Sequence, residues 1–321
     1  MNPAAQLGPL NPGDVVSAAL RLYRDRFKTY LKLSALATLW LLGGLVGLVL
    51  LIALPVAMLS TLGSSFLPII GGLGGLVLGF LALLYGSAKY YQLSGVMGRL
   101  VFCDLVNRPE TASAAQRLLA PKLGQFLWLG FLLFLAYMAA YLAASLGALI
   151  AGGAVGLLIA GMFTALINGT VGGILGGILG LMLGLGVFVL VLIWILARLF
   201  IADAVLAIEA SQDAGGSLSR SWELTQTSVW RIQIVFLAAF LIQLPILMVT
   251  NYFPSLFFAF LPDNTAVLAA SQGIGLLLSL LGSVLTLPLW QAVKAVLYYD
   301  LRSRREGLDL ELRHPPEQTN P

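Results

Sequence analysis

Few residues in this chain have side chains suited to chemistry. Cys103 is the only cysteine and His314 the only histidine, and His314 lies in a proline-rich segment close to the end of the sequence. A single cysteine cannot form a disulfide within the chain or a cysteine-based metal site. No nucleophile in the sequence has a plausible base beside it. We therefore predict no catalytic residue, no metal site and no cofactor.

Basic residues form the pattern best suited to binding a ligand. Arg99, Arg198 and Lys294 are spaced 99 and 96 residues apart, and each precedes an aspartate by five or six positions. Together with Lys89, they lie at or beyond the ends of long apolar runs, where cationic side chains can extend to lipid headgroups. One interpretation is that they only fix the orientation of the chain in a membrane. The alternative is a basic collar that binds lipid phosphates.

Short polar segments share a second pattern, an acid followed seven positions later by an arginine. They are Asp14–Arg21 (DVVSAALR), Glu110–Arg117 (ETASAAQR) and Asp213–Arg220 (DAGGSLSR). An acid in the first turn and a base near the last turn complement the helix dipole, which indicates short helices. Such helices can also lie in the membrane interface and bind anionic lipid or a partner. Trp222 and Trp230, beside the third segment, suit that interface.

The composition identifies the environment in which these residues act. Hydrophobic residues make up 59% of the 321 residues and charged residues only 10%, with a mean hydropathy of +0.95. An average soluble domain has about 25% charged residues. The sequence therefore predicts an all-α integral membrane protein. Its net charge of +4 is explained by membrane orientation, so no nucleic-acid partner is predicted.

Apolar runs long enough to span a bilayer occur six times. They cover about Leu33–Leu59, Phe66–Ala88, Gly124–Gly152, Gly172–Ala197, Ile232–Phe253 and Gly273–Val293. Residues 123–197 contain no charge, and Asn168-Gly169 offers a turn between two spans. The glycine-rich stretch 147–186 leaves the helix ends open, and a re-entrant segment is an alternative there.

Lys and Arg are distributed on one side of the predicted spans. All 18 lie before the first span, between the second and third, between the fourth and fifth, or after the sixth. The opposite connections contain only Asp263 among charged residues. Because cytoplasmic loops retain Lys and Arg, both termini are predicted to be cytoplasmic in a bacterial inner membrane. The start of the sequence does not resemble a cleaved signal peptide, so the first helix is expected to remain.

The two patterns of charged residues divide the chain into similar units. Units 13–105, 106–209 and 210–303 would each consist of a short cytoplasmic amphipathic helix followed by a membrane hairpin. The predicted architecture is six transmembrane helices as three pseudo-repeated hairpins. Residues 1–12 form a polar tail before the membrane domain at 13–303, and residues 304–321 form a cytoplasmic tail.

Glycines recur every fourth residue in two of the spans. Gly172, Gly176, Gly180 and Gly184 would lie on one helix face, as would the glycines at 71, 75 and 79. Such a face lets another backbone approach closely, so it predicts helix packing. A pore lined by these faces is the alternative, although no polar residue accompanies them.

Several short strings carry a family resemblance. They are Gly13-Asp14-Val15 with LRLYRDRF (20–27), RSWELTQ (220–226) and LYYDLRSRREGLDLE (297–311). They resemble the membrane domain attached to some bacterial glycerophosphoryl diester phosphodiesterases, and stand-alone membrane proteins related to it. That resemblance implies the membrane module alone. The catalytic residues of those enzymes lie in a separate soluble barrel, so none carries over to this sequence.

The sequence as a whole favours a non-enzymatic multi-pass membrane protein, a scaffold or lipid-associated accessory module. The alternative is a transporter or channel for lipid or a small solute, which internal repeats would suit. Coupled transport is disfavoured because no ionisable residue lies in the middle of a predicted span. A lipid-modifying enzyme is the weakest reading. Membrane lipids, anionic ones in particular, are the expected partners, and a protein partner or homo-oligomer stays open.

Overall fold

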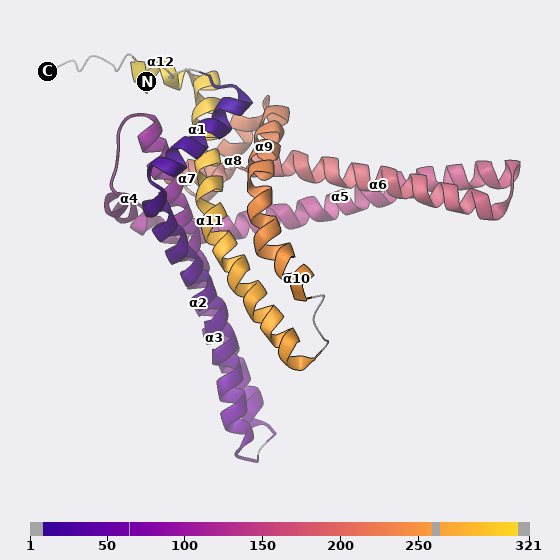
Figure 1. Ribbon diagram of the computed structural model, residues 1–321, viewed down its shortest axis with the longest axis horizontal. Helices are drawn as coiled ribbons and strands as arrows, with labels where there is room; N and C mark the ends of the chain where they lie inside the picture. Colours follow the sequence, from indigo (N-terminus) through magenta and orange to yellow (C-terminus); the bar gives the residue numbers. More distant parts are fainter. Residues whose placement is uncertain (1–8, 64, 259–263, 314–321) are drawn as a thin grey trace.

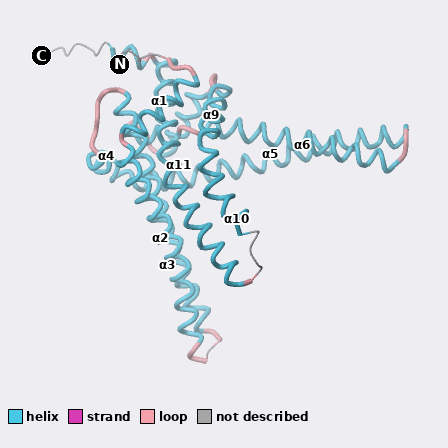
Figure 2. The backbone as a smooth tube through the Cα atoms, in the orientation of Figure 1, coloured by secondary structure: helices cyan, strands magenta, loops and turns pink. Residues whose placement is uncertain are grey.

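The computed structural model describes residues 9–63, 65–258 and 264–313. Within these ranges the chain is helical and has no β-strand (Figure 2). Long helices lead away from a cluster of shorter ones that includes the first and the last described helix (Figure 1).

Among the described residues, six helices are long and apolar enough to cross a membrane. They are α2 (Phe27–Ser60), α3 (Leu67–Leu105), α5 (Leu123–Leu166), α6 (Gly169–Leu199), α9 (Val229–Leu247, continued by η3, Met248–Tyr252) and α11 (Thr265–Glu306). Each corresponds to one of the predicted apolar runs. The prediction of an all-α, multi-pass membrane protein is therefore confirmed.

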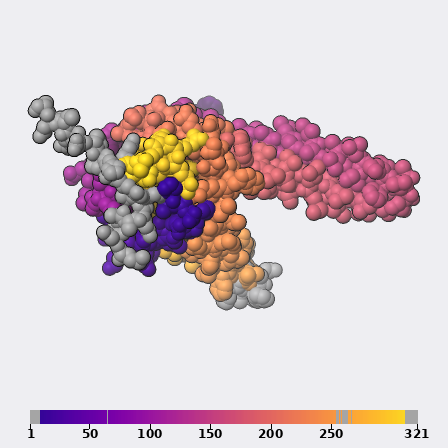
Figure 3. All heavy atoms as spheres, turned by 90° about the horizontal axis from the view of Figure 1, so that it is seen from above, coloured from indigo at the N-terminus to yellow at the C-terminus, as the bar shows by residue number. Residues whose placement is uncertain are grey.

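Helices α5 and α6 form a hairpin, here called the arm, with its turn at Ile167 and Asn168. The Asn168 side chain caps α6 by accepting a hydrogen bond from the Val171 amide at 2.8 Å. Both helices are continuous, so the arm contains no re-entrant segment. The 44 residues of α5 extend about 66 Å at 1.5 Å per residue. The arm accordingly projects beyond the rest of the protein (Figure 3).

The third hairpin is less regular than the other two. Pro245 lies inside α9 and has no N–H to donate, and two residues after it α9 gives way to the π-helix η3. A short helix, α10 (Phe253–Phe258), follows η3, and α11 returns beside them. Figure 1 shows this hairpin and α2–α3 leaving the short helices in directions different from that of the arm.

The short helices pack around the inner ends of α3, α9 and α11, and together they form a unit here called the head. They are α1 (Pro12–Asp25), α4 (Ala112–Leu119), η2 (Ala120–Lys122), α7 (Ala202–Ile208), α8 (Ala214–Thr225) and α12 (Leu308–Arg313). Residues 314–321, including His314, are outside the described residues, and α11 continues to Glu306.

The acids of the polar segments cap their helices in different ways. The Asp14 carboxylate accepts from the Asn11 amide at 3.3 Å, inside the first turn of α1. Asp213 caps α8 itself by accepting from an amide at 2.6 Å. Thr111, rather than Glu110, caps α4. Short helix and hairpin alternate as the sequence predicted, but whether the units are true repeats stays a prediction.

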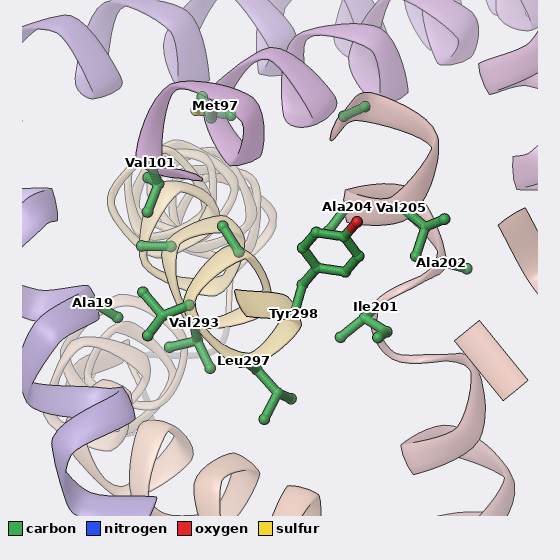
Figure 4. Packing of buried hydrophobic residues seen from close by; sticks show 14 of the residues in the cluster. Ala19, Met97, Val101, Ile201, Ala202, Ala204, Val205, Val293, Leu297 and Tyr298 are labelled. Carbon is green, nitrogen blue, oxygen red and sulfur yellow. The ribbon is translucent and has the colours of Figure 1, made fainter. Parts of the chain in front are cut away.

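The core of the head forms where α3, α7 and α11 meet. Met97 of α3, Val293 of α11 and Val205 of α7 belong to one cluster of buried residues. Figure 4 shows the Tyr298 side chain of α11 pointing toward Ala204 of α7. Residues 202–207 of α7 are all buried. Small side chains on α7 allow it to lie between the longer helices, and the burial of apolar surface stabilises this arrangement by about 25 cal/mol per Å². Sequence patterns did not predict α7 as a separate element.

The four glycines of α6 are buried against α5. A methyl group at Gly180 would lie 2.5 Å from the carbonyl oxygen of Gly152 and 2.9 Å from the Cα atom of Gly156. The two backbones are thus too close for any side chain at this position. In the α2–α3 hairpin, a methyl group at Gly79 would lie 2.7 Å from the Cα atom of Leu48. These contacts favour the packing interpretation of the glycine faces.

Replacing Gly180 with alanine should destabilise the arm, because the added methyl group would force α5 and α6 apart. We expect a loss of about 1–3 kcal/mol, the usual cost of overpacking. Thermal unfolding of the purified protein in detergent measures it. Gly177→Ala is the matched control, since open space surrounds that position within 4 Å. Equal melting temperatures for the two variants would contradict the packing role of Gly180.

Candidate functional site

A buried aspartate connects α7 to α11. Asp203 Oδ2 accepts hydrogen bonds from Lys294 Nζ at 2.7 Å and from Gln291 Nε2 at 3.2 Å. The Lys294 ammonium also lies 5.5 Å from the centre of the Phe200 ring. A buried carboxylate is tolerated only with such partners. Lys294, predicted as part of a basic collar, is thus engaged inside the protein.

Arg99 has internal partners as well. Its Nε donates to Glu110 Oε2 at 2.9 Å, and its Nη1 donates to the carbonyl oxygen of Ala207 at 3.3 Å. The thiol of Cys103 lies 3.6 Å from the same Glu110 oxygen. Arg99 therefore connects α3 to the end of α7 and to the segment before α4.

Lys122 binds the same C-terminal end of α7 and the loop after it. Its Nζ donates to the carbonyl oxygens of Leu206 at 3.2 Å, Glu209 at 2.9 Å and Gln212 at 3.3 Å. The last carbonyls of a helix have no partner within that helix, and a cation there also complements its dipole. Lys122 thus connects the start of the arm to α7.

Two further aspartates at the inner helix ends receive bases from other helices. Asp104 pairs with Arg26 at 2.9 Å. Asp300, whose side chain is fully buried, accepts from Arg231 Nε at 2.9 Å and from the Leu10 amide at 2.7 Å. Asp300 therefore joins the chain start, α9 and α11 at one point.

A network of charges on the outer side of the head surrounds Arg220. Its guanidinium contacts Glu209, at 3.4 Å, and Glu306. Tyr298 donates to Glu209 at 2.7 Å, and Arg302 donates to the Tyr298 hydroxyl at 3.2 Å. Burial by itself lowers the pKa of Arg220, but its bonds to Glu306 and Glu209 outweigh burial and raise it. Arg220 is thus a structural cation that joins α8 to α11.

Arg198 is buried but, unlike the matched bases Arg99 and Lys294, it has no acidic partner in the part of the chain that is described. Its guanidinium carbon lies 5.0 Å from the ring centre of Trp194 and 4.9 Å from that of Trp222. Nη1 donates to the Trp222 carbonyl oxygen at 3.3 Å, while the buried Nε has no hydrogen-bond partner. Only 9% of Arg198 is exposed.

A groove lies beside this arginine, where the arm meets α8. Its volume is about 720 Å³, within the range of roughly 300–1,000 Å³ typical of ligand sites. One wall consists of alanines of α5, and the other walls come from α6 and α8. The lining includes Ala136, Ala139, Ala140, Ala143, Trp194, Leu199, Ser219, Trp222, Glu223 and Gln226.

The remaining predicted site residues do not join this groove. Lys89 donates to Gln92 Oε1 at 3.3 Å, within α3. Arg21 and Arg117 are exposed on α1 and α4. Trp230, at the start of α9, is 73% exposed. Contact of these residues with lipid stays a prediction.

The head offers little for covalent chemistry within the described residues. No group of three or more His, Cys, Asp or Glu residues in those ranges could hold a metal ion. The Cys103 thiol faces a carboxylate that is already paired with Arg99. The head instead provides a set of ion pairs and a groove beside which the Arg198 guanidinium lies against Trp194 and Trp222.

Comparison of the chain with protein-family models, curated proteins and solved structures found no match. The resemblance to the phosphodiesterase-associated membrane domain stays a prediction.

Sequence reasoning missed the residues that hold the head together. Asp203 and Asp300 were noticed only as the acids that follow a base, and Lys122 only as one of the topology-determining cations. Their partners come from positions 69 to 91 residues away, as in the Arg231–Asp300 and Lys294–Asp203 pairs. The base and the acid at matching positions in successive units are the sequence feature that could have indicated these ion pairs.

Replacing Asp300 with asparagine should destabilise the head strongly. The substitution leaves Arg231 and Arg304 without a carboxylate at a buried site, which typically costs about 3–5 kcal/mol. Thermal unfolding in detergent measures the loss. Asp25→Asn is the control, because Asp25 is exposed and lies 4.0 Å from Arg24. If Asp300→Asn were no less stable than Asp25→Asn, Asp300 would not fix the head.

Proposed function

We propose that this chain is a non-enzymatic, lipid-associated scaffold of a bacterial inner membrane, with the head and both termini in the cytoplasm. One observation carries the proposal: the head uses its buried charges to hold the hairpins together. Asp203, Asp300 and Glu209 each accept bonds from a different helix. These groups are occupied in structure rather than left available for a reaction.

The exposed faces of the hairpins support a role in organising other membrane components. Large apolar side chains of the arm, such as Leu157 and Leu181, are 77% and 73% exposed. In a bilayer, these faces contact lipid or neighbouring proteins. Because the three hairpins leave the head separately, the protein exposes several distinct apolar surfaces to the membrane.

Exposed cations on the head and at the adjoining start of α2 support contact with lipid. Lys28, Lys32, Arg108 and Arg117 are exposed and have no salt bridge in the part of the chain that is described. Each cation close to an anionic membrane surface contributes about 1 kcal/mol of attraction. These residues are better placed for headgroup contact than Arg99 and Lys294, which have internal carboxylate partners.

A transporter or channel for lipid or small solute is the second candidate, favoured by the similar order of helices in the successive units. Residues 33–88, 123–197 and 264–293 contain no Asp, Glu, Lys, Arg or His. A polar pathway through these spans would have to use only neutral groups. The scaffold is therefore the better supported function.

The orientation can be tested with single cysteines. In a Cys103→Ser background, Arg117→Cys should react with a membrane-impermeant maleimide in inside-out vesicles. Thr61→Cys, at the exposed far end of α2, should react instead in intact spheroplasts. Labelling of Arg117→Cys from the periplasmic side would place the head outside the cytoplasm.

The scaffold role is tested by reconstitution and by crosslinking. Proteoliposomes should release a trapped dye and move fluorescent lipid between leaflets no faster than protein-free vesicles. A photo-crosslinking residue at Leu157 should give discrete protein adducts in native membranes, whereas one at Val293, which is 0% exposed, should not. Flux above the protein-free level would favour the transporter. Equal adducts from both positions would show that crosslinking is unspecific and would count against the scaffold.

A further inference from the structure

Arg198 and Glu223 are opposite charges that lie close together without pairing. Arg198 donates to the carbonyl oxygen of Trp222, whose peptide bond leads directly to Glu223. No salt bridge joins the two side chains. The Glu223 side chain is 62% exposed and lies 3.9 Å from Arg220, and the Glu223 carbonyl oxygen accepts from Arg305. Arg220 is itself held by Glu209 and another carboxylate. A ligand that carries both charges would satisfy both residues.

Arg198 lies on the face of α6 that lines the groove. Successive helix residues are rotated by about 100°, so Arg198 lies about 40° from Trp194, and Leu199 lies about 140° from it. Trp194 and Leu199 line the groove, and Arg198 lies between them on the helix without being part of the lining itself. An anion in the groove would have to reach the guanidinium through the 9% of Arg198 that is exposed.

The buried guanidinium is incompletely compensated by its neighbours. Two indoles provide cation–π contacts, which stabilise a cation only modestly. The Nε hydrogen has no acceptor. A buried charge without an opposite charge is strongly unfavourable, and the fork of guanidinium donors matches the geometry of phosphate as well as of carboxylate. The site is thus suited to a phosphate group.

The groove around these charges is amphipathic. Alanines 136, 139, 140 and 143 of α5 form an apolar wall on a helix that is long enough to cross the membrane. Ser219, Glu223 and Gln226 of α8 form the polar side. Indoles prefer the level of the headgroups, where Trp194 and Trp222 would mark the boundary. An acyl chain fits the alanine wall, and a polar headgroup fits the α8 side.

We propose that the groove between α5, α6 and α8 binds one aminophospholipid, with its phosphate at Arg198, its ammonium group at Glu223 and an acyl chain along the alanines of α5. The inference deepens the proposed scaffold function, on which it rests, by naming the lipid class. It replaces a general preference for anionic lipid at this position with a preference for a zwitterionic headgroup that carries a primary amine.

The experiment measures lipid binding to the purified, delipidated full-length chain by native mass spectrometry and by tryptophan fluorescence. The probes are phosphatidylethanolamine, phosphatidylglycerol, phosphatidylcholine and inorganic phosphate. We expect one phosphatidylethanolamine to bind most tightly, because among these probes only its ammonium group both carries a positive charge and donates hydrogen bonds to Glu223. Inorganic phosphate should not reproduce the effect, since it lacks the acyl chain.

Variants separate the contributions of the groove. Arg198→Gln should weaken binding of both phosphatidylethanolamine and phosphatidylglycerol about tenfold or more, as expected for loss of a charged hydrogen bond. Glu223→Gln changes an exposed side chain and should not impair folding. It should weaken the binding of phosphatidylethanolamine alone. Ala143→Leu should weaken the binding of every lipid, because the larger side chain would fill part of the groove. Lys28→Gln and Ala154→Leu are the matched controls, an exposed cation and an exposed alanine outside the groove.

The proposal is overturned if Glu223→Gln leaves the lipid preference unchanged, or if Lys28→Gln weakens binding as much as Arg198→Gln. It is also overturned if phosphatidylglycerol binds as tightly as phosphatidylethanolamine, or if inorganic phosphate alone gives the same fluorescence change. These outcomes concern binding at one groove. They are distinct from flux in proteoliposomes, which tests the scaffold function.

Discussion

Pairing of buried carboxylates at the inner ends of the long helices is the interaction on which the head depends. Asp300 has a fully buried side chain, and Asp203 is nearly as buried. An ionised carboxylate at such a site is strongly destabilising unless a cation and further donors satisfy it. Lys294, Arg231 and their neighbours therefore have to come to these positions. The helices that carry them are fixed in place as a consequence.

The hairpins are held by a different force. Lipid chains are as apolar as leucine, so hydrophobic burial does not drive helices together within a bilayer. Glycines such as Gly180 and Gly79 let the backbones approach closely and gain dispersion contacts instead. Ion pairs therefore stabilise the head, and close packing at glycines stabilises the hairpins.

Arg198 is the exception within this scheme, and its position suggests why. The other matched bases, Arg99 and Lys294, have carboxylate partners, whereas Arg198 lies against two indoles that contact each other beside a groove. Carboxylates compensate the charges of Arg99 and Lys294, and leaving the buried Arg198 without one is energetically unfavourable. A bound charged ligand is the simplest explanation for this unpaired arginine. A lipid bound there would lie where the arm meets the head.

The sequence by itself determined the membrane class, the six helices that are long and apolar enough to span, and the spacing that puts glycines on one helix face. Each of these depends on composition or spacing within about 20 residues, the length of one span. Only the tertiary structure decided which base meets which acid, because Asp203 and Lys294 are 91 positions apart. It also decided that α7 inserts into the core and that Arg198 forms no salt bridge within the described residues. Such pairings depend on how helices from different units pack, and hydrophobic periodicity carries no information about partners.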